Sequence, residues 1–100
     1  MPVEYKVNNN EKLMHFEIHD DDTIAFLEYR FYKNNIAFMH TAVPKSMEGK
    51  GIASTLASYA FNYAKDHEKP VMVYCPFVST YLKRHPEVHW QLDKEFHKTN

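Results

Sequence analysis

Glycine is scarce in this sequence, and the two glycines that occur stand close together. A chain of 100 residues would ordinarily hold about seven, whereas this one has 2, Gly49 and Gly51. Internal repeats, linkers and low-complexity stretches are also missing, which argues against division of the chain. We therefore expect a single domain over residues 1–100, in which the paired glycines mark a special position.

Cysteine, net charge and long apolar runs are equally sparse. Cys75 is the only cysteine, so no intramolecular disulfide can form, as suits a reducing compartment. With a formal net charge of -1, the chain lacks the positive electrostatic potential that attracts nucleic acid or an anionic membrane. The longest strongly apolar run, residues 71–78, is far short of a membrane span, and the first residues have no apolar leader. These features predict a cytoplasmic protein, a monomer or weak dimer, with no nucleic-acid or membrane partner.

Apolar and polar residues alternate with period two over the first 43 positions, which is typical of half-buried strands. We predict an antiparallel meander whose strands span residues 3–7, 12–19, 23–32 and 36–43. Polar clusters at 8–10, 20–22 and 33–35 supply the turns. The segment 36–43 is apolar on both faces and should therefore be a central strand.

After Pro44 the apolar period changes from two to 3.6, which predicts a helix over residues 51–66. A short β-branched run at 71–74 follows and should be a buried strand, parallel to 36–43 through a right-handed crossover. A second helix is expected over 77–84, whereas the tail at 88–96 fits either period. The fold class is thus α+β, with a mixed, mostly antiparallel sheet and a βαβ crossover.

Both glycines fall in the junction between the central strand and the long helix, in the segment Glu48-Gly49-Lys50-Gly51-Ile52-Ala53. The first N–H groups of a helix have no intrahelical partner and carry partial positive charge, so an anion is a natural ligand there. Lys50 adds a cation, and the glycines permit turn conformations that a β-carbon disfavours. The segment is neither a Walker A loop nor a dinucleotide fingerprint. A tight turn without a ligand is the alternative interpretation.

His40 and Cys75 are the side chains best suited to chemistry. By strict alternation His40 shares a face with Ile36 and Phe38, where a neutral imidazole can accept a proton. Cys75 precedes Pro76 and the second helix. A thiol at a helix N-terminus can be partly ionised, and the thiolate is the form that attacks a thioester. The alternatives are a core histidine bonded to the backbone and a cysteine that acts as a small apolar residue. Both residues are predicted at the C-terminal edge of adjacent parallel strands, where open sheets bind ligands.

The other histidines give no metal-binding pattern. His85 and His89 are four residues apart but Pro86 interrupts them, and His15 and His19 share one strand face without a third ligand of suitable spacing. We expect no metal site.

The glycine segment and its neighbours resemble a known family. Residues 48–54, opening an amphipathic helix after a strand and Pro44, resemble the pyrophosphate loop of the GNAT acetyltransferases, Gln/Arg-x-x-Gly-x-Gly/Ala. Gly51 and Ala53 match its last two positions, and Glu48 stands where Gln or Arg is usual. The sequences His40-Thr41-x-Val43-Pro44, Cys75-x-x-Val78 and Tyr81-Leu82-x-Arg84-x-Pro86 resemble the small single-domain GNAT-like proteins of about 100 residues. This resemblance spans roughly residues 12–90.

The resemblance implies a minimal GNAT-like acyl-CoA N-acyltransferase fold with acetyl-CoA (coenzyme A) as co-substrate. Coenzyme A would lie between the strands at 36–43 and 71–74, with His40 and Cys75 as the reactive pair near the thioester. From its place one or two helical turns after Cys75, Tyr81 could protonate the departing thiolate, and packing against the sheet is the alternative. The residues expected to contact the cofactor are Val43, Gly49, Lys50, Gly51, Ile52, Ala53, Ser54 and Tyr81.

The function implied is acetyl transfer from acetyl-CoA to an unidentified amine acceptor. Either His40 deprotonates an amine that attacks the thioester directly, or Cys75 first accepts the acetyl group. Two other functions stay open: a coenzyme A or acyl-CoA-binding module with little catalysis, and a Cys-His thioester hydrolase.

Overall fold

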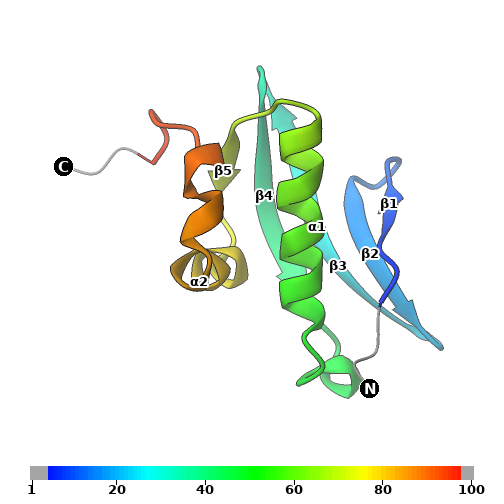
Figure 1. Ribbon diagram of the computed structural model, residues 1–100. Helices are drawn as coiled ribbons and strands as arrows, with labels where there is room; N and C mark the ends of the chain where they lie inside the picture. Colours follow the sequence, from blue (N-terminus) through cyan, green and yellow to red (C-terminus); the bar gives the residue numbers. More distant parts are fainter. Residues whose placement is uncertain (1–4, 98–100) are drawn as a thin grey trace.

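Five strands form one sheet in the order β1-β2-β3-β4-β5, with helices packed on one of its faces (Figure 1). The computed structural model describes residues 5–97 of the chain. The strands are β1 (Asn8–Asn10), β2 (His15–Asp20), β3 (Thr23–Tyr32), β4 (Asn35–Ala42) and β5 (Val71–Val73). The helices are the 3-10 turn η1 (Lys45–Met47), α1 (Ile52–Asp66), α2 (Pro76–Arg84) and the 3-10 helix η2 (Pro86–Gln91).

The predicted α+β architecture is confirmed. Strands β1 to β4 form an antiparallel meander, and β5 lies parallel to β4 after the crossover through α1. β4 is an interior strand between β3 and β5, as its two apolar faces predicted. β3 has the predicted bounds, and α1 begins one residue later than expected because Gly51 is its N-cap.

The N-terminal prediction was wrong. Residues 3 and 4 of the expected strand lie outside the described part of the chain, residues 5–7 are not a strand, and the expected turn at 8–10 is β1 itself. Asparagine favours turns, but here two asparagine side chains have tertiary partners: Tyr29 Oη donates to Asn9 Oδ1 at 2.7 Å and Asn10 Nδ2 donates to Glu17 Oε2 at 3.1 Å. The turn therefore falls at residues 11–14, and β2 starts later than predicted.

The hydrophobic core lies between the sheet and the two α-helices. Leu56 and Ala60 of α1 are fully buried against the apolar residues of β2, β3 and β4. α2 packs beside α1, with the ring of Tyr81 stacked on that of Phe61 at 5.8 Å between centroids. No helix in the described part of the chain covers the opposite face of the sheet (Figure 1). That face carries the residues of β2 and β3 that alternate with the core residues, among them His15, Glu17 and Glu28.

A β-bulge in β4 changes which residues face the helices. Tyr29 pairs with Phe38, but the preceding residue of β3, Glu28, pairs with His40, so Met39 is an extra residue in β4. Because a bulge shifts the alternation by one residue, Thr41 points to the helix side and is buried, whereas His40 is exposed on the other face. The expectation that His40 shares the apolar face of Ile36 and Phe38 was wrong.

The tail, whose period was ambiguous, forms η2 and then runs beside β5. Leu92 makes a parallel bridge with Val71, and the Val73 N–H donates to Nε2 of His97 at 3.0 Å. None of the helices within residues 5–97 is long and apolar enough to span a membrane.

The bond to His97 predicts a pH dependence of stability. Burial lowers the pKa of His97 below 6.5, against a smaller opposing effect of the Asp93 carboxylate. The unfolded chain therefore binds this proton more readily than the folded chain, and the free energy of unfolding falls as the pH drops below about 6.5. Urea titrations between pH 5 and 8 should show a shallower decline for His97→Gln, whose amide oxygen still accepts the bond. An identical decline in both proteins would contradict this assignment.

Candidate functional site

The glycine loop has the backbone conformation that the sequence predicted. Pro44 ends β4, the turn η1 anchors the chain through the buried side chain of Met47, and the loop then reaches α1. Gly49 has φ 77° and Gly51 has φ 74°, both left-handed. A Cβ added at either glycine would meet nothing within 4 Å, so the positive φ and not lack of space accounts for glycine here.

The first turn of α1 has backbone N–H groups without a hydrogen-bond partner among residues 5–97. Gly51 is the N-cap without a side-chain capping bond, and the first turn holds no acidic residue. The first backbone bond of the helix runs from Thr55 N–H to the Gly51 carbonyl at 3.0 Å, which leaves the preceding N–H groups at 52–54 directed out of the helix end. Lys50 lies beside them, its Nζ 3.8 Å from Asp20 Oδ2. This end of α1 therefore suits an anion.

Two hollows adjoin this helix end. One, of about 270 Å³, is lined by predicted residues of α1, Ala53 and Ser54, and by Tyr81 of α2. The other, of about 470 Å³, shares Ser54 and Tyr81 with it and adds residues of the N-terminal segment. The fold thus brings together Ala53, Ser54 and Tyr81, three residues predicted to contact the cofactor, although Tyr81 lies almost 30 positions from the other two in the sequence. Tyr81 is held between two rings, since it also stacks on His85 with centroids 4.0 Å apart.

Arg84 also lines this region, although it was not among the residues predicted to contact the cofactor. It lines the smaller hollow three residues after Tyr81, in the last turn of α2. Residues three apart lie on the same helix face, so the Tyr81-Leu82-x-Arg84 spacing contained the signal. Its guanidinium adds a second cation near the α1 N-terminus and matches phosphate geometry.

β4 and β5 separate beside this region. Their pairing ends at Phe38 and Val73, with a last bond from Tyr74 N–H to the Phe38 carbonyl at 3.0 Å. β5 is only three residues long and the chain turns into α2 at Pro76, which cannot donate to a ladder. The rest of β4, from Met39 to Ala42, has no strand partner on this edge among residues 5–97. Val43, half-buried and packed against the core, continues this edge.

Cys75 lies inside this opening and is fully buried. It is the N-cap of α2, as expected, and its Sγ is 3.1 Å from Thr41 Oγ1. Thr41 faces the cysteine because of the bulge, whereas the side chain of His40 lies on the opposite side of β4. His40 meets Phe26 there in an edge-to-face contact with centroids 6.1 Å apart. The structure therefore places the two predicted reactive residues on either side of one strand and not in contact.

The other histidine pairs bind carboxylates. His15 Nδ1 and His19 Nε2 lie 3.6 Å and 2.9 Å from the two oxygens of Glu17. His85 pairs with Glu87 and not with His89. In the described part of the chain, no group of three or more His, Cys, Asp or Glu residues is arranged to hold a metal ion.

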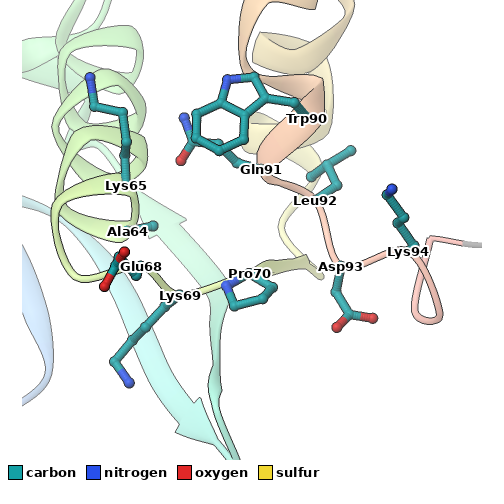
Figure 2. Close-up of a pocket in the computed structure, with 10 residues that line it drawn as sticks. All are labelled: Ala64, Lys65, Glu68, Lys69, Pro70, Trp90, Gln91, Leu92, Asp93 and Lys94. Atoms are coloured by element: carbon teal, nitrogen blue, oxygen red, sulfur yellow. The ribbon is translucent and has the colours of Figure 1, made fainter.

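A larger hollow, of about 530 Å³, lies at the other end of α1 (Figure 2). Ala64 and Lys65 of α1 face Trp90 and Gln91 across it, and none of the predicted site residues lines it. The glycine end is the better candidate, because helix N–H groups without a partner among residues 5–97, the side chains of Lys50 and Arg84, and the unpaired edge of β4 all lie toward it.

Comparison with known proteins identifies the family of this chain. The sequence model of the GCN5-related N-acetyltransferase family matches residues 15–92, which includes the glycine loop, the bulged strand and α2. The chain belongs to this family. It is also 26% identical over 85 residues to Protein NATD1 of Xenopus tropicalis, a match that covers 81% of this chain and 77% of that protein.

Membership of the GCN5-related family supports acetyltransferase activity, and the family generally uses acetyl-CoA with amine acceptors. The matched range contains each element of the site: β4 with its bulge, the glycine loop, the start of α1, Cys75 and α2. Membership of the family thus agrees with the predicted acetyltransferase activity in general terms.

Proposed function

We propose that the chain transfers the acetyl group of acetyl-CoA to an amine, with the cofactor bound between α1, α2 and the opening of β4. The observation that supports this most is the uncapped N-terminus of α1, which adjoins the hollow between the helices. The pyrophosphate would accept bonds from backbone N–H groups of Gly49, Gly51, Ile52, Ala53 and Ser54, with Lys50 and Arg84 as cations. Val43 and the free edge of β4 would contact the pantetheine arm, whose amides need backbone partners.

His40 is the base in this proposal. Its exposed imidazole takes a proton from the acceptor ammonium, and the nitrogen lone pair then forms a bond to the carbonyl carbon of the thioester. The carbon–sulfur bond breaks, and the sulfur takes up the proton of the Tyr81 hydroxyl as it leaves. The nitrogen, which still carries one proton too many for an amide, gives that proton up and so restores the Tyr81 hydroxyl. The net reaction converts an ammonium ion and acetyl-CoA into an acetamide, free coenzyme A and one proton.

Burial of Cys75 favours direct transfer over an acetyl-cysteine intermediate. A nucleophilic thiol must reach the carbonyl carbon as a thiolate, yet Cys75 is fully buried and in contact with Thr41 Oγ1. In the direct route Cys75 and Thr41 line the side of the opening that faces the helices. Intact mass spectrometry after incubation with acetyl-CoA should show no acetylated protein, which would be about 42 Da heavier than the unmodified protein. An adduct that disappears in Cys75→Ala would establish the covalent route instead.

Calorimetry with acetyl-CoA, followed by measurement of released thiol, tests the whole proposal. We expect saturable binding and thiol release that depends on an added amine. No saturable binding at high micromolar acetyl-CoA would overturn the assignment. Binding without release would indicate a coenzyme A-binding module, and release without amine would indicate a hydrolase.

Arg84→Gln should weaken acetyl-CoA binding by roughly fivefold to tenfold, because one charge-assisted bond to phosphate is lost. Lys83→Gln is the matched control: it removes one positive charge from the neighbouring position, which does not line the hollow. Isothermal calorimetry on both variants separates a specific contact from a general loss of charge. Equal weakening by the two substitutions would contradict the role of Arg84.

A further inference from the structure

The face of the sheet that the helices leave uncovered carries an ordered cluster around His40. The rings of His15 and Phe26 stack with centroids 4.1 Å apart and an angle of 4°, and Phe26 meets His40 edge to face. Three neighbouring strands, β2, β3 and β4, each contribute one of these rings. The rings of His15 and Phe26 form an aromatic strip beside His40, the proposed base.

Glu28 lies in the middle of this strip. It is the register partner of His15 on β2 and of His40 on β4, so its side chain projects between them on the same face. Arg30 Nη2 donates to Glu28 Oε2 at 2.8 Å and fixes the carboxylate. Within residues 5–97 the other oxygen, Oε1, accepts no hydrogen bond. A carboxylate oxygen beside the proposed base is thus held in position and left open.

Glu17 gives the strip a rigid second end. Its side chain is only 8% exposed although no helix covers this face, because His15, His19 and Asn10 surround it. These contacts fix the ring of His15 against Phe26. The carboxylates of Glu17 and Glu28 outnumber the single guanidinium of Arg30 beside them. This negative excess next to aromatic rings is complementary to a cation that also carries an apolar chain.

We propose that this face binds the acetyl acceptor as a protonated primary alkylamine, with Glu28 Oε1 accepting a bond from the ammonium group and the Phe26–His15 strip contacting the alkyl chain. The inference rests on the proposed function, since it assigns the side from which the acceptor reaches His40. The helix side of β4 is closed to the acceptor, because Thr41 and Cys75 are buried there. Once His40 has taken the proton, the neutral nitrogen lies beside the opening of β4 where the thioester would be.

A binding experiment with n-butylammonium at pH 7 tests this without relying on turnover. The Cε1–H resonances of His15 and His40 in the NMR spectrum should shift in a saturable way. n-Butanol, which has the same chain without the charge, should bind at least about fivefold more weakly, and Glu28→Gln should weaken butylammonium binding by about the same factor. Glu68→Gln is the matched control, because that glutamate lies at the far end of α1 beside the larger hollow.

The outcomes separate this inference from the proposed function. Non-saturable shifts, equal binding of butanol and butylammonium, or unchanged affinity in Glu28→Gln would each overturn the acceptor site. Loss of affinity in Glu68→Gln equal to that in Glu28→Gln would do the same, because it would indicate a general charge effect. Calorimetry with acetyl-CoA is run on the same samples: absence of cofactor binding there would overturn the proposed function while the butylammonium result stands on its own.

Discussion

Replacing His40 by glutamine should lower kcat for acetyl transfer by roughly 100- to 1,000-fold and leave the dissociation constant of acetyl-CoA unchanged. A positioned general base contributes about this much to a rate, and glutamine cannot take the proton from the acceptor. His40 is exposed at the bulge, so the substitution leaves the core intact and should alter the free energy of unfolding by less than about 0.5 kcal/mol. Steady-state kinetics and calorimetry on the same preparation measure both quantities.

The pH profile distinguishes a base from a residue that only maintains structure. At higher pH more of the acceptor is already deprotonated, so the rate deficit of His40→Gln should narrow as the pH rises from 7 to 9. His67→Gln, an exposed histidine at the end of α1, should retain wild-type kinetics throughout. A deficit that is constant across this range, or a variant with full activity, would show that His40 is not the base.

The second large effect is expected from Gly51→Asp, which should weaken acetyl-CoA binding by about tenfold or more while lowering the free energy of unfolding by no more than about 1 kcal/mol. Aspartate tolerates the left-handed conformation better than most residues, and a negative charge at a helix N-terminus is favourable. The same charge repels the phosphates of the cofactor. The affinity for acetyl-CoA should therefore fall far more than the free energy of unfolding. A substitution that acted only by disrupting the turn would lower both.

Gly51→Asn separates charge from shape at this position. Asparagine has nearly the same volume as aspartate and also tolerates positive φ, so it should weaken binding much less. Calorimetry with acetyl-CoA and urea unfolding are needed for both variants. Equal loss of affinity in the two would assign the effect to bulk in the loop, and unchanged affinity in Gly51→Asp would remove the pyrophosphate from this helix end.

Elements with a strong apolar period were predicted well from the sequence. α1 and β3 have nearly the expected bounds because many residues support each period and one exception changes little. The glycine loop was also predicted, because positive φ at two nearby positions strongly favours glycine. The short elements were predicted less well: β1 depends on asparagine bonds to Tyr29 and Glu17 from other strands.

His40 shows where strict alternation fails. The segment from Ile36 to Ala42 contains neither glycine nor proline, so nothing in it marks Met39 as the bulged residue. Whether a strand bulges depends on its partner, since the register shift exists only between β3 and β4. One residue of shift exposed His40 and buried Thr41, which changed the expected geometry of the site.

By itself, the sequence determined the order of the elements, the position of the glycine loop and the residues able to do chemistry, because these follow from apolar period, backbone conformation and side-chain type. Only the tertiary structure decided which face each reactive side chain occupies and which distant residues join it. Arg84 and Ser54 line one hollow, Thr41 contacts Cys75, and Glu28 lies beside His40, because strand register and helix packing bring them together. Those relations depend on contacts between segments far apart in the chain, and local sequence patterns do not contain them.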